Sequence, residues 1–199
     1  MYIPAYAERH DVGLLHEFIE AHSFGTLISA ANGITANHYP FILDAEEGVL
    51  WTHLARANPQ RGELKDRAKC LAIFQGPHAY ISPLHYVERR NVPTWNYTAV
   101  HAECEATLIE DDQGIEDILR RTVSRFDKRW TYDLPEEFKS RLRQAIVGVR
   151  LKMTKLEGKF KLSQNRSKED YESVLRAFEA RSDDNSRELL AYMRKTSPA

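Results

Sequence analysis

Apolar and polar residues alternate along several short stretches of the chain, which is the pattern of half-buried β-strands. In 100–108, every second residue from Val100 to Leu108 is apolar and the residues between them are polar. Successive side chains of a strand point to opposite faces, so this stretch predicts a strand with one buried face. Similar runs lie at 25–30, 34–43, 48–54, 69–76 and 78–82. Their spacing predicts an antiparallel sheet that curls into a barrel, and Asn32-Gly33 predicts a hairpin between the first two runs.

The last expected strand, from Val147 onward, contains a change of phase. Apolar residues occupy every second position from Val147 to Met153, but the next apolar residue, Leu156, comes three positions later. One extra residue in a strand, a β-bulge, restores alternation after such a slip. We therefore predict one long strand with a bulge near Lys155.

Helices are predicted where apolar residues recur every three or four positions. The first begins at Asp11, carries Leu15, Phe18 and Ile19 on one face and ends before Gly25. Further helices are expected at 115–126, from Pro135 to Ile146, and in two segments after Lys168. The expected order of elements is one helix, many strands, two helices, a strand and two helices. This order predicts a mainly β fold with flanking helices.

Composition narrows the possible partners and locations. The 28 Lys and Arg residues almost balance the 29 Asp and Glu residues, so the total charge does not favour a protein whose whole surface binds nucleic acid or membrane. No apolar run approaches the roughly 20 residues of a membrane span. The N-terminal sequence MYIPAYAERHD resembles neither a secretory signal nor a transit peptide. We therefore expect a cytoplasmic protein.

The cysteine and histidine positions do not predict a metal site. Cys70 and Cys104 each lie in an apolar run, without a CxxC pair or a Cys/His cluster beside them. Buried, reduced thiols are the expected state of such residues. The histidines are too scattered to give a metal-ligand spacing, and no Ser/His/Asp, Cys/His or paired-carboxylate arrangement identifies catalytic residues.

Four polar stretches at strand ends contain the candidate binding chemistry: ITANHYPFIL, WTHLARANPQ, FQGPHAYISPLHY with VPTWNYTAVH, and KFKLSQNRS. Arg56 and Asn58 follow the strand that carries His53, and a guanidinium group suits a phosphate because it forms paired charged hydrogen bonds. The alternative is a surface cation before a helix start at Asn58. Aromatic residues such as Trp95 suit stacking on a planar ring, although packing in the core or an interface would also explain them.

The same stretches carry a family resemblance. The segments MYIPAY, HLARANPQ, FQGPHAYISP, VPTWNY and KFKLSQNRS, in this order and spacing, resemble the PaiB family of FMN-binding negative transcriptional regulators over residues 1–170. The resemblance implies a split β-barrel of the pyridoxamine-phosphate-oxidase type. It also implies a homodimer that holds one FMN per subunit at the dimer interface. We accordingly expect an FMN-binding domain at 1–166 and a C-terminal helical extension at 167–199, packed on the same domain or on the dimer partner.

The resemblance also implies which residues line the FMN site. The phosphate and ribityl end is expected near His53, Ala55, Arg56 and Asn58, with Tyr80 and Ser82 as hydroxyl partners. The rest of the site is expected to involve Thr94, Trp95, Asn96, Gln164 and Asn165. The chain departs from the family pattern at His85-Tyr86, where members usually have Trp then Tyr, and at 102–104, where they usually have small residues. Neither departure affects the phosphate-side residues.

Three functions remain open at this point. The family label implies a negative transcriptional regulator, but the sequence contains no pattern of a helix-turn-helix, so DNA binding rests on analogy. The basic residues between Arg120 and Arg143 are interrupted by acidic ones, which favours a solvated helical face over a DNA-contacting patch. The alternatives are an FMN-dependent oxidoreductase or flavin reductase, and a flavin-binding sensor with a protein partner.

Overall fold

The computed structural model describes residues 1–88 and 90–196, and the chain divides into two compact units. The first unit contains Met1–Asp11, Gln75–Val100 and the chain from Glu157 onward. The second unit contains Val12–Phe74 and His101–Leu156. Three long strands contribute residues to both units, and each unit is described by itself below.

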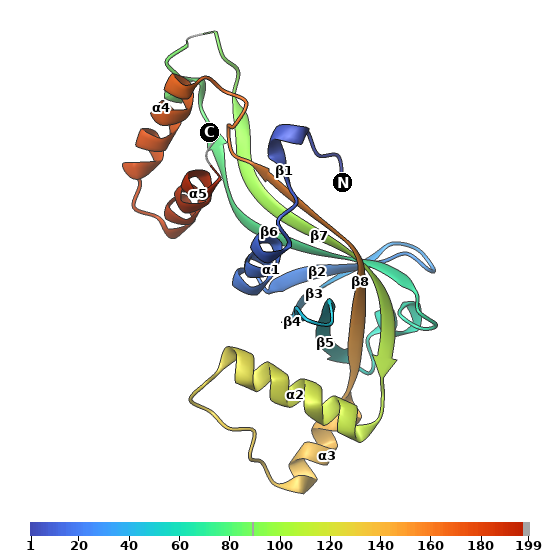
Figure 1. The fold of residues 1–199 in the computed structure, drawn as a ribbon. Coiled ribbons are helices and arrows are strands. Elements are labelled where there is room, and N and C mark those ends of the chain that lie inside the picture. The colour runs from blue at the N-terminus through green and yellow to red at the C-terminus, as the bar shows by residue number, and fades with distance from the viewer. Residues whose placement is uncertain (89, 197–199) are drawn as a thin grey trace. The chain divides into compact units, whose positions relative to one another are not determined.

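The strands belong to one sheet of eight strands (Figure 1). They are β1 (Glu8–Arg9), β2 (Phe24–Ser29), β3 (Thr35–Pro40), β4 (Ile42–Asp44), β5 (Val49–Ala55), β6 (Lys69–Ile81), β7 (Thr94–Ile109) and β8 (Ile146–Lys161). The order across the sheet is β3-β2-β6-β7-β8-β5-β4, and β1 pairs with β8. The pairs β2–β3, β2–β6, β4–β5, β5–β8 and β1–β8 are antiparallel.

Five α-helices and three short 3₁₀ helices accompany the sheet in the described residues. The α-helices are α1 (Val12–Ala21), α2 (Asp112–Phe126), α3 (Glu136–Ala145), α4 (Lys168–Glu179) and α5 (Asp184–Lys195). The 3₁₀ helices are η1 (Ala5–Ala7), η2 (Pro59–Glu63) and η3 (Pro83–His85). The prediction of a mainly β fold with flanking helices is therefore confirmed.

Two strand predictions need correction. The runs 69–76 and 78–82 are a single strand, β6, in which the buried face changes: Phe74 is buried at an even position, but Pro77 and Ala79 are buried at odd ones. The chain thus continues through Gly76-Pro77, a pair that usually interrupts strands. The strand predicted at 100–108 also begins earlier than expected, because β7 starts at Thr94 and includes most of the PTWNY motif.

The predicted change of phase in β8 is present. Leu151 is buried on one phase of the strand, and Gly158 and Phe160 are buried on the other. β5 pairs with the first part of β8, whereas β1 pairs with the second part, where Glu8 lies opposite Lys159. The bulge near Lys155 itself stays a prediction.

The second unit packs α1 and α2 on strands whose apolar faces the sequence identified. Leu15, Phe18 and Ile19 of α1 are fully buried, as predicted. The backbone of Gly148 on β8 lies so close to α2 that a Cβ atom there would stand 2.3 Å from Cδ1 of Ile118. Because this distance is far below van der Waals contact, a larger residue at this position would require the end of the Ile118 side chain to move.

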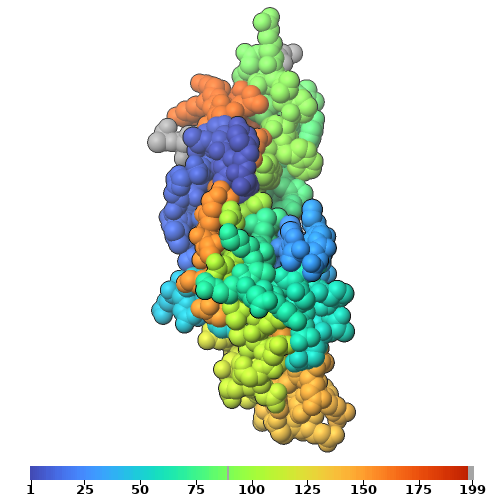
Figure 2. Space-filling model, turned by 90° about the vertical axis from the view of Figure 1, so that its right-hand side faces the viewer, coloured from blue at the N-terminus to red at the C-terminus, as the bar shows by residue number. Residues whose placement is uncertain are grey.

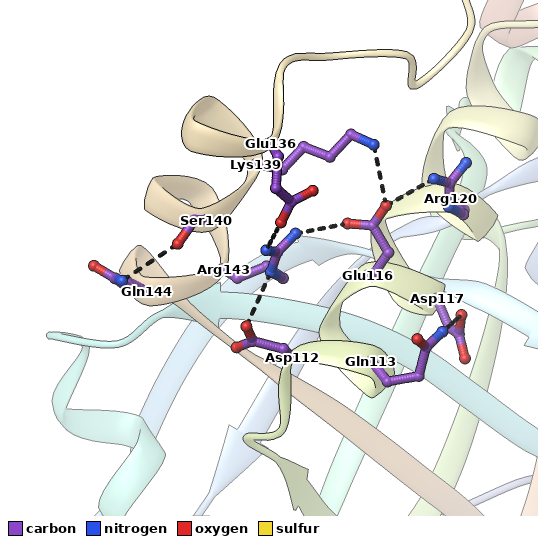
Figure 3. Close-up of polar contacts among 10 residues, drawn as sticks. All are labelled: Asp112, Gln113, Glu116, Asp117, Arg120, Glu136, Lys139, Ser140, Arg143 and Gln144. Atoms are coloured by element: carbon purple, nitrogen blue, oxygen red, sulfur yellow. Dashed lines mark hydrogen bonds and ion pairs between the residues drawn. The ribbon is translucent and has the colours of Figure 1, made fainter.

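α3 is fixed to α2 by a group of charged side chains (Figure 3). Arg143 is only 8% exposed and forms ion pairs with Asp112 at 3.4 Å, with Glu116 at 3.3 Å and with Glu136. Glu116 also pairs with Arg120 at 2.8 Å and with Lys139 at 3.8 Å. In Figure 2 the segment that contains α3, in orange, lies against the yellow-green segment of α2.

The helix α3 ends at Ala145, one residue before the predicted end, because Ile146 already belongs to β8.

The first unit packs α4 and α5 together and against its own strands. The hydroxyl of Tyr171 on α4 donates a hydrogen bond to the carbonyl oxygen of Met193 on α5, at 2.7 Å. Asn185, in the first turn of α5, bonds both backbone groups of His78 on β6, at 3.2 and 2.8 Å. These hydrogen bonds hold the C-terminal helices against the strand segment beside them. The division of the chain into an FMN-binding domain at 1–166 and a helical extension at 167–199 stays a prediction.

Within residues 1–88 and 90–196, no helix is long and apolar enough to cross a membrane. The same residues contain no group of three or more His, Cys, Asp or Glu side chains that could hold a metal ion.

Candidate functional site

The predicted phosphate-side residues lie in the second unit, at the end of β5. His53 and Ala55 are on β5, where His53 lies opposite Gly148 and Ala55 opposite Ile146 of β8. His53 is half-buried, and this burial lowers the pKa of its imidazole, so the neutral form is favoured near neutral pH. A neutral imidazole can donate or accept a hydrogen bond without adding charge to the site.

Arg56 follows β5 and is held by the last residues of α3. Its backbone N–H donates to the carbonyl oxygen of Ala145 at 2.8 Å, and its Nε donates to the carbonyl oxygen of Gln144 at 3.0 Å. These are carbonyl groups at the C-terminal end of a helix, where the helix dipole favours a cation. The side chain remains 35% exposed, so solvent reaches part of it.

Arg61 and Glu110 lie beside Arg56, and neither was predicted from the sequence. Arg61 on η2 donates from Nε at 3.1 Å and also from Nη2 to Oε1 of Glu110. Nη1 of Arg56 lies 3.5 Å from the same oxygen. The hydrogen bond from Arg61 lowers the pKa of the Glu110 carboxyl, with further contributions from the charges of Arg56 and Lys65. The carboxylate is therefore charged at neutral pH.

The side chain of Asn58 forms hydrogen bonds within the fold. Its Oδ1 accepts a hydrogen bond from the backbone N–H of Gln60 at 3.0 Å, which caps η2, and its Nδ2 donates to the hydroxyl of Tyr39 at 3.0 Å. The side chain of Gln60 is fully buried and bonds Tyr39, Asn37, Ser29 and the carbonyl oxygen of Leu27. A buried polar network whose members are all bonded is rigid. This network fixes the chain segment that presents Arg56 and Arg61.

The predicted ring-side residues lie in the first unit, where the structure joins two of the motifs. Thr94, Trp95 and Asn96 begin β7, and Lys161 ends β8. The Nζ of Lys161 donates to Oγ1 of Thr94 and to the carbonyl oxygen of Trp95, each at 2.6 Å. Burial lowers the pKa of Lys161, and the charges of Arg166 and Lys159 act in the same direction.

Aromatic side chains are exposed beside this junction. Trp95 is 51% exposed and Tyr80 is 47% exposed, and their rings meet edge to face with centroids 6.2 Å apart. The ring of His78 lies 5.6 Å from that of Trp95. Large exposed aromatic groups gathered in this way are typical of a surface that contacts a planar ligand or another chain.

The polar members of the ring-side set differ in availability. Asn96 is fully buried and accepts a hydrogen bond from Ser163. Gln164 bonds its own turn, accepting from the N–H of Leu162 and donating to the carbonyl oxygen of Phe160. Tyr80 and Ser82, which were expected as hydroxyl partners at the phosphate and ribityl end, also belong to the first unit, and the hydroxyl of Ser82 caps η3 by accepting from the N–H of Leu84. Asn165, in contrast, is exposed.

The predicted residues therefore form two sets, each gathered within its own unit. His53, Ala55, Arg56 and Asn58 are neighbours in the second unit, and Thr94, Trp95, Asn96 and Gln164 come together in the first with Tyr80 beside Trp95. Arg61, Glu110 and Lys161 were missed. The only available signal was their charge, and their partners are distant in sequence.

Comparison with known proteins identifies relatives over the whole chain. Residues 1–155 match the family model described as "Putative FMN-binding domain". The chain is 33% identical over 202 residues to "Protease synthase and sporulation protein PAI 2" of Bacillus subtilis (strain 168), with 97% of this chain and 96% of that protein covered.

Two solved structures show the fold. The flavocytochrome Anf3 of Azotobacter vinelandii matches with a TM-score of 0.64 at 15% identity, over 86% of this chain and 78% of that one. The FAD and heme binding protein of Mycobacterium smegmatis matches with a TM-score of 0.59 at 10% identity, over 78% and 73%. The predicted fold class, a split barrel of the pyridoxamine-phosphate-oxidase type with flanking helices, is confirmed. The chain belongs to the FMN-binding domain family that its motifs predicted, the PaiB family, of which PAI 2 is a member.

Proposed function

We propose that this chain binds FMN and serves as a negative transcriptional regulator of the PaiB type. The protein is proposed to act in the cytoplasm as a homodimer, with one FMN per subunit at the subunit interface. The family model supports the choice of FMN, since it matches residues 1–155. Bound FMN supplies hydride or electron transfer through its ring.

The phosphate group of FMN is proposed to bind at Arg56, near His53, Ala55 and Asn58. The observation that carries the proposal is the state of Arg56, a partly exposed guanidinium group whose Nε and backbone N–H are already fixed by carbonyl groups. A fixed guanidinium with accessible terminal nitrogens binds a phosphate without losing much conformational freedom. The donor chemistry of this set fits the anionic end of FMN.

The ring-side residues are proposed to contact the flavin ring. Trp95 offers exposed aromatic surface beside Tyr80, and Asn165 offers an exposed amide group. The hydroxyls of Tyr80, Ser82 and Thr94 are proposed as further hydrogen-bond partners of FMN. Asn96 and Gln164 are proposed to contribute by holding the two chain segments in place, since their side chains bond within the unit.

An FMN-dependent oxidoreductase or flavin reductase is the second candidate, and one observation disfavours the competing function of direct DNA contact. Among the basic residues of α2 and α3, Arg120, Arg121, Lys139, Arg141 and Arg143 all form ion pairs with carboxylates. Tight DNA binding needs a surface with a net excess of cations, and the paired carboxylates offset the charge of these basic residues. This surface does not support direct DNA contact.

Arg56→Ala tests the proposed phosphate site. We expect FMN affinity to fall by roughly tenfold to a hundredfold, because a charge-assisted phosphate contact is lost. Riboflavin has the same ring without the phosphate, so its affinity should not change. Arg67→Ala, at an exposed arginine paired with Glu105 in the same unit, is the matched control. Equal FMN affinity of folded Arg56→Ala and Arg67→Ala proteins would contradict the proposed placement.

Two assays separate the candidate functions. A regulator that contacts DNA should bind promoter DNA at low salt and lose affinity steeply as salt rises. An oxidoreductase should show bleaching of bound FMN by reduced nicotinamide and recovery with oxygen or another acceptor. No mobility shift of promoter DNA in either flavin redox state would exclude direct regulation, and no bleaching with either nicotinamide would exclude the commonest form of the enzyme.

A further inference from the structure

Two arginine side chains converge on one carboxylate oxygen in the second unit. Arg61 donates to Oε1 of Glu110 from Nε at 3.1 Å and from Nη2, and Nη1 of Arg56 lies 3.5 Å from the same oxygen. The side chains of Arg61 and Glu110 are 31% and 44% exposed. A ligand in solution can therefore reach all three groups.

This arrangement differs from an ordinary ion pair on the surface of the same unit. Arg67 donates to Oε2 of Glu105 from Nε at 3.0 Å and from Nη2, in the same forked geometry, but the two residues form a simple pair. Glu110, in contrast, carries one negative charge against two guanidinium groups. The group of three keeps a net positive charge, which favours an anion with more charge than one carboxylate.

Exchange of Glu110 for another anion costs little. Ion pairs between partly exposed side chains contribute little to stability. Arg56 keeps its bonds to the carbonyl groups of Gln144 and Ala145 when Glu110 moves away. Arg61 stays on η2, which Asn58 caps. Both arginines thus remain in place for a new partner.

A phosphate monoester matches this pair better than a carboxylate does. It carries up to two negative charges on three terminal oxygens, so each guanidinium group can form paired hydrogen bonds to it. We propose that Arg61 is a second phosphate-binding residue and that Glu110 is an internal counter-ion, which holds Arg56 and Arg61 together and gives way to the phosphate group of the ligand. This inference rests on the proposed function, in which FMN is that ligand.

Two substitutions with opposite expected effects test the inference. In Glu110→Gln no charged side chain competes with the phosphate, so we expect FMN to bind at least about fivefold more tightly. In Arg61→Ala one guanidinium group is lost, so FMN should bind at least about tenfold more weakly. Riboflavin affinity should not change in either variant. Glu105→Gln and Arg67→Ala, at the simple pair, are the controls and should match the unsubstituted protein. Binding is measured by titration, after thermal unfolding has shown that each variant is folded.

The outcomes separate this inference from the proposed function. The proposed function holds if the unsubstituted protein prefers FMN to riboflavin and Arg56→Ala removes that preference. In that case, unchanged FMN affinity in both Glu110→Gln and Arg61→Ala would overturn the counter-ion inference alone. Weaker FMN binding by Glu110→Gln would also overturn it, since the carboxylate would then be supporting the site. If no protein binds FMN, titration with inorganic phosphate decides: tighter binding by Glu110→Gln than by the unsubstituted protein supports the exchange, and equal or absent binding overturns it.

Discussion

The side chains of Asn96 and Ser163 are joined by a hydrogen bond: the hydroxyl of Ser163 donates to Oδ1 of Asn96 at 3.1 Å. Both residues are buried, and Nδ2 of Asn96 faces the sulfur of Met193 at 3.9 Å. The bond connects the start of β7 to the turn after β8, and thus the PTWNY motif to the KLSQN motif.

We expect Asn96→Ala to lower the free energy of unfolding by about 1–3 kcal/mol, because Ser163 loses its buried acceptor. Urea denaturation measures the change. Asn165→Ala, at an exposed position two residues beyond Ser163, is the control and should stay within about 0.5 kcal/mol. A loss in Asn96→Ala no larger than in the control would show that the bond does not support the fold.

Trp95→Leu should weaken FMN binding several-fold and increase the fluorescence of bound flavin. The indole of Trp95 is half-exposed beside Tyr80 and His78, and an aromatic ring close to a flavin stabilises it by stacking and quenches its emission. Titration followed by flavin fluorescence measures both effects. Trp130→Leu, at a similarly exposed tryptophan in the other unit, should behave like the unsubstituted protein. If the two variants behave alike, Trp95 does not contact the ring.

Glu136 gives a prediction on pH. The hydrogen bond from Arg143 lowers the pKa of the Glu136 carboxyl below its ordinary value of 4.5. A carboxyl whose pKa is lower in the folded state stabilises the fold above the ordinary value, and this contribution is lost as pH falls through the folded value. The melting temperature of Glu136→Gln should therefore lie below that of the unsubstituted protein at pH 7.

That difference should shrink progressively as pH falls below 4.5. Glu137→Gln, which removes the solvent-exposed partner of Arg141, is the control and should show little difference at either pH. A difference in melting temperature that stays constant from pH 7 to pH 3 would mean that the pair with Arg143 does not determine it.

The two cysteines should react slowly with a thiol reagent in the native protein. Cys70 and Cys104 are buried, and the thiol of Cys70 lies 3.7 Å from the carbonyl oxygen of Cys104. Burial raises the pKa of Cys70 to about 12 and also raises the pKa of Cys104, so the reactive thiolate is scarce at pH 8. Assay with an aromatic disulfide should detect two thiols only after denaturation. Rapid release of one equivalent from the native protein would contradict this burial.

The sequence predicted the elements with clear periodicity and missed the continuity between them. Val100, Ala102, Cys104 and Ala106 form the buried face of β7 as expected, because strand alternation is a local property. The strand begins earlier than predicted, and its first part buries the polar residues Asn96 and Thr98 between less buried neighbours. A polar residue becomes buried only when distant partners satisfy its hydrogen bonds, and a local pattern does not contain them.

The candidate site shows the same limit. The motifs identified Arg56 and Trp95, but the partners that define their surroundings come from far along the chain: Glu110 is 49 residues from Arg61, and Lys161 is 66 residues from Trp95. The hydroxyl and amide groups of Ser82, Asn58 and Gln164 looked available in the sequence and are used by nearby backbone groups in the fold. Sequence motifs therefore located the segments of the site better than the role of each side chain.

The claim that the chain binds FMN is tested by titrating the purified protein with FMN and following the visible absorption spectrum. Any chromophore that is already bound is first released by heat and identified by chromatography. We expect a shifted flavin spectrum that saturates at one FMN per chain. A protein that carries no FMN and shows no spectral change on its addition would contradict the claim.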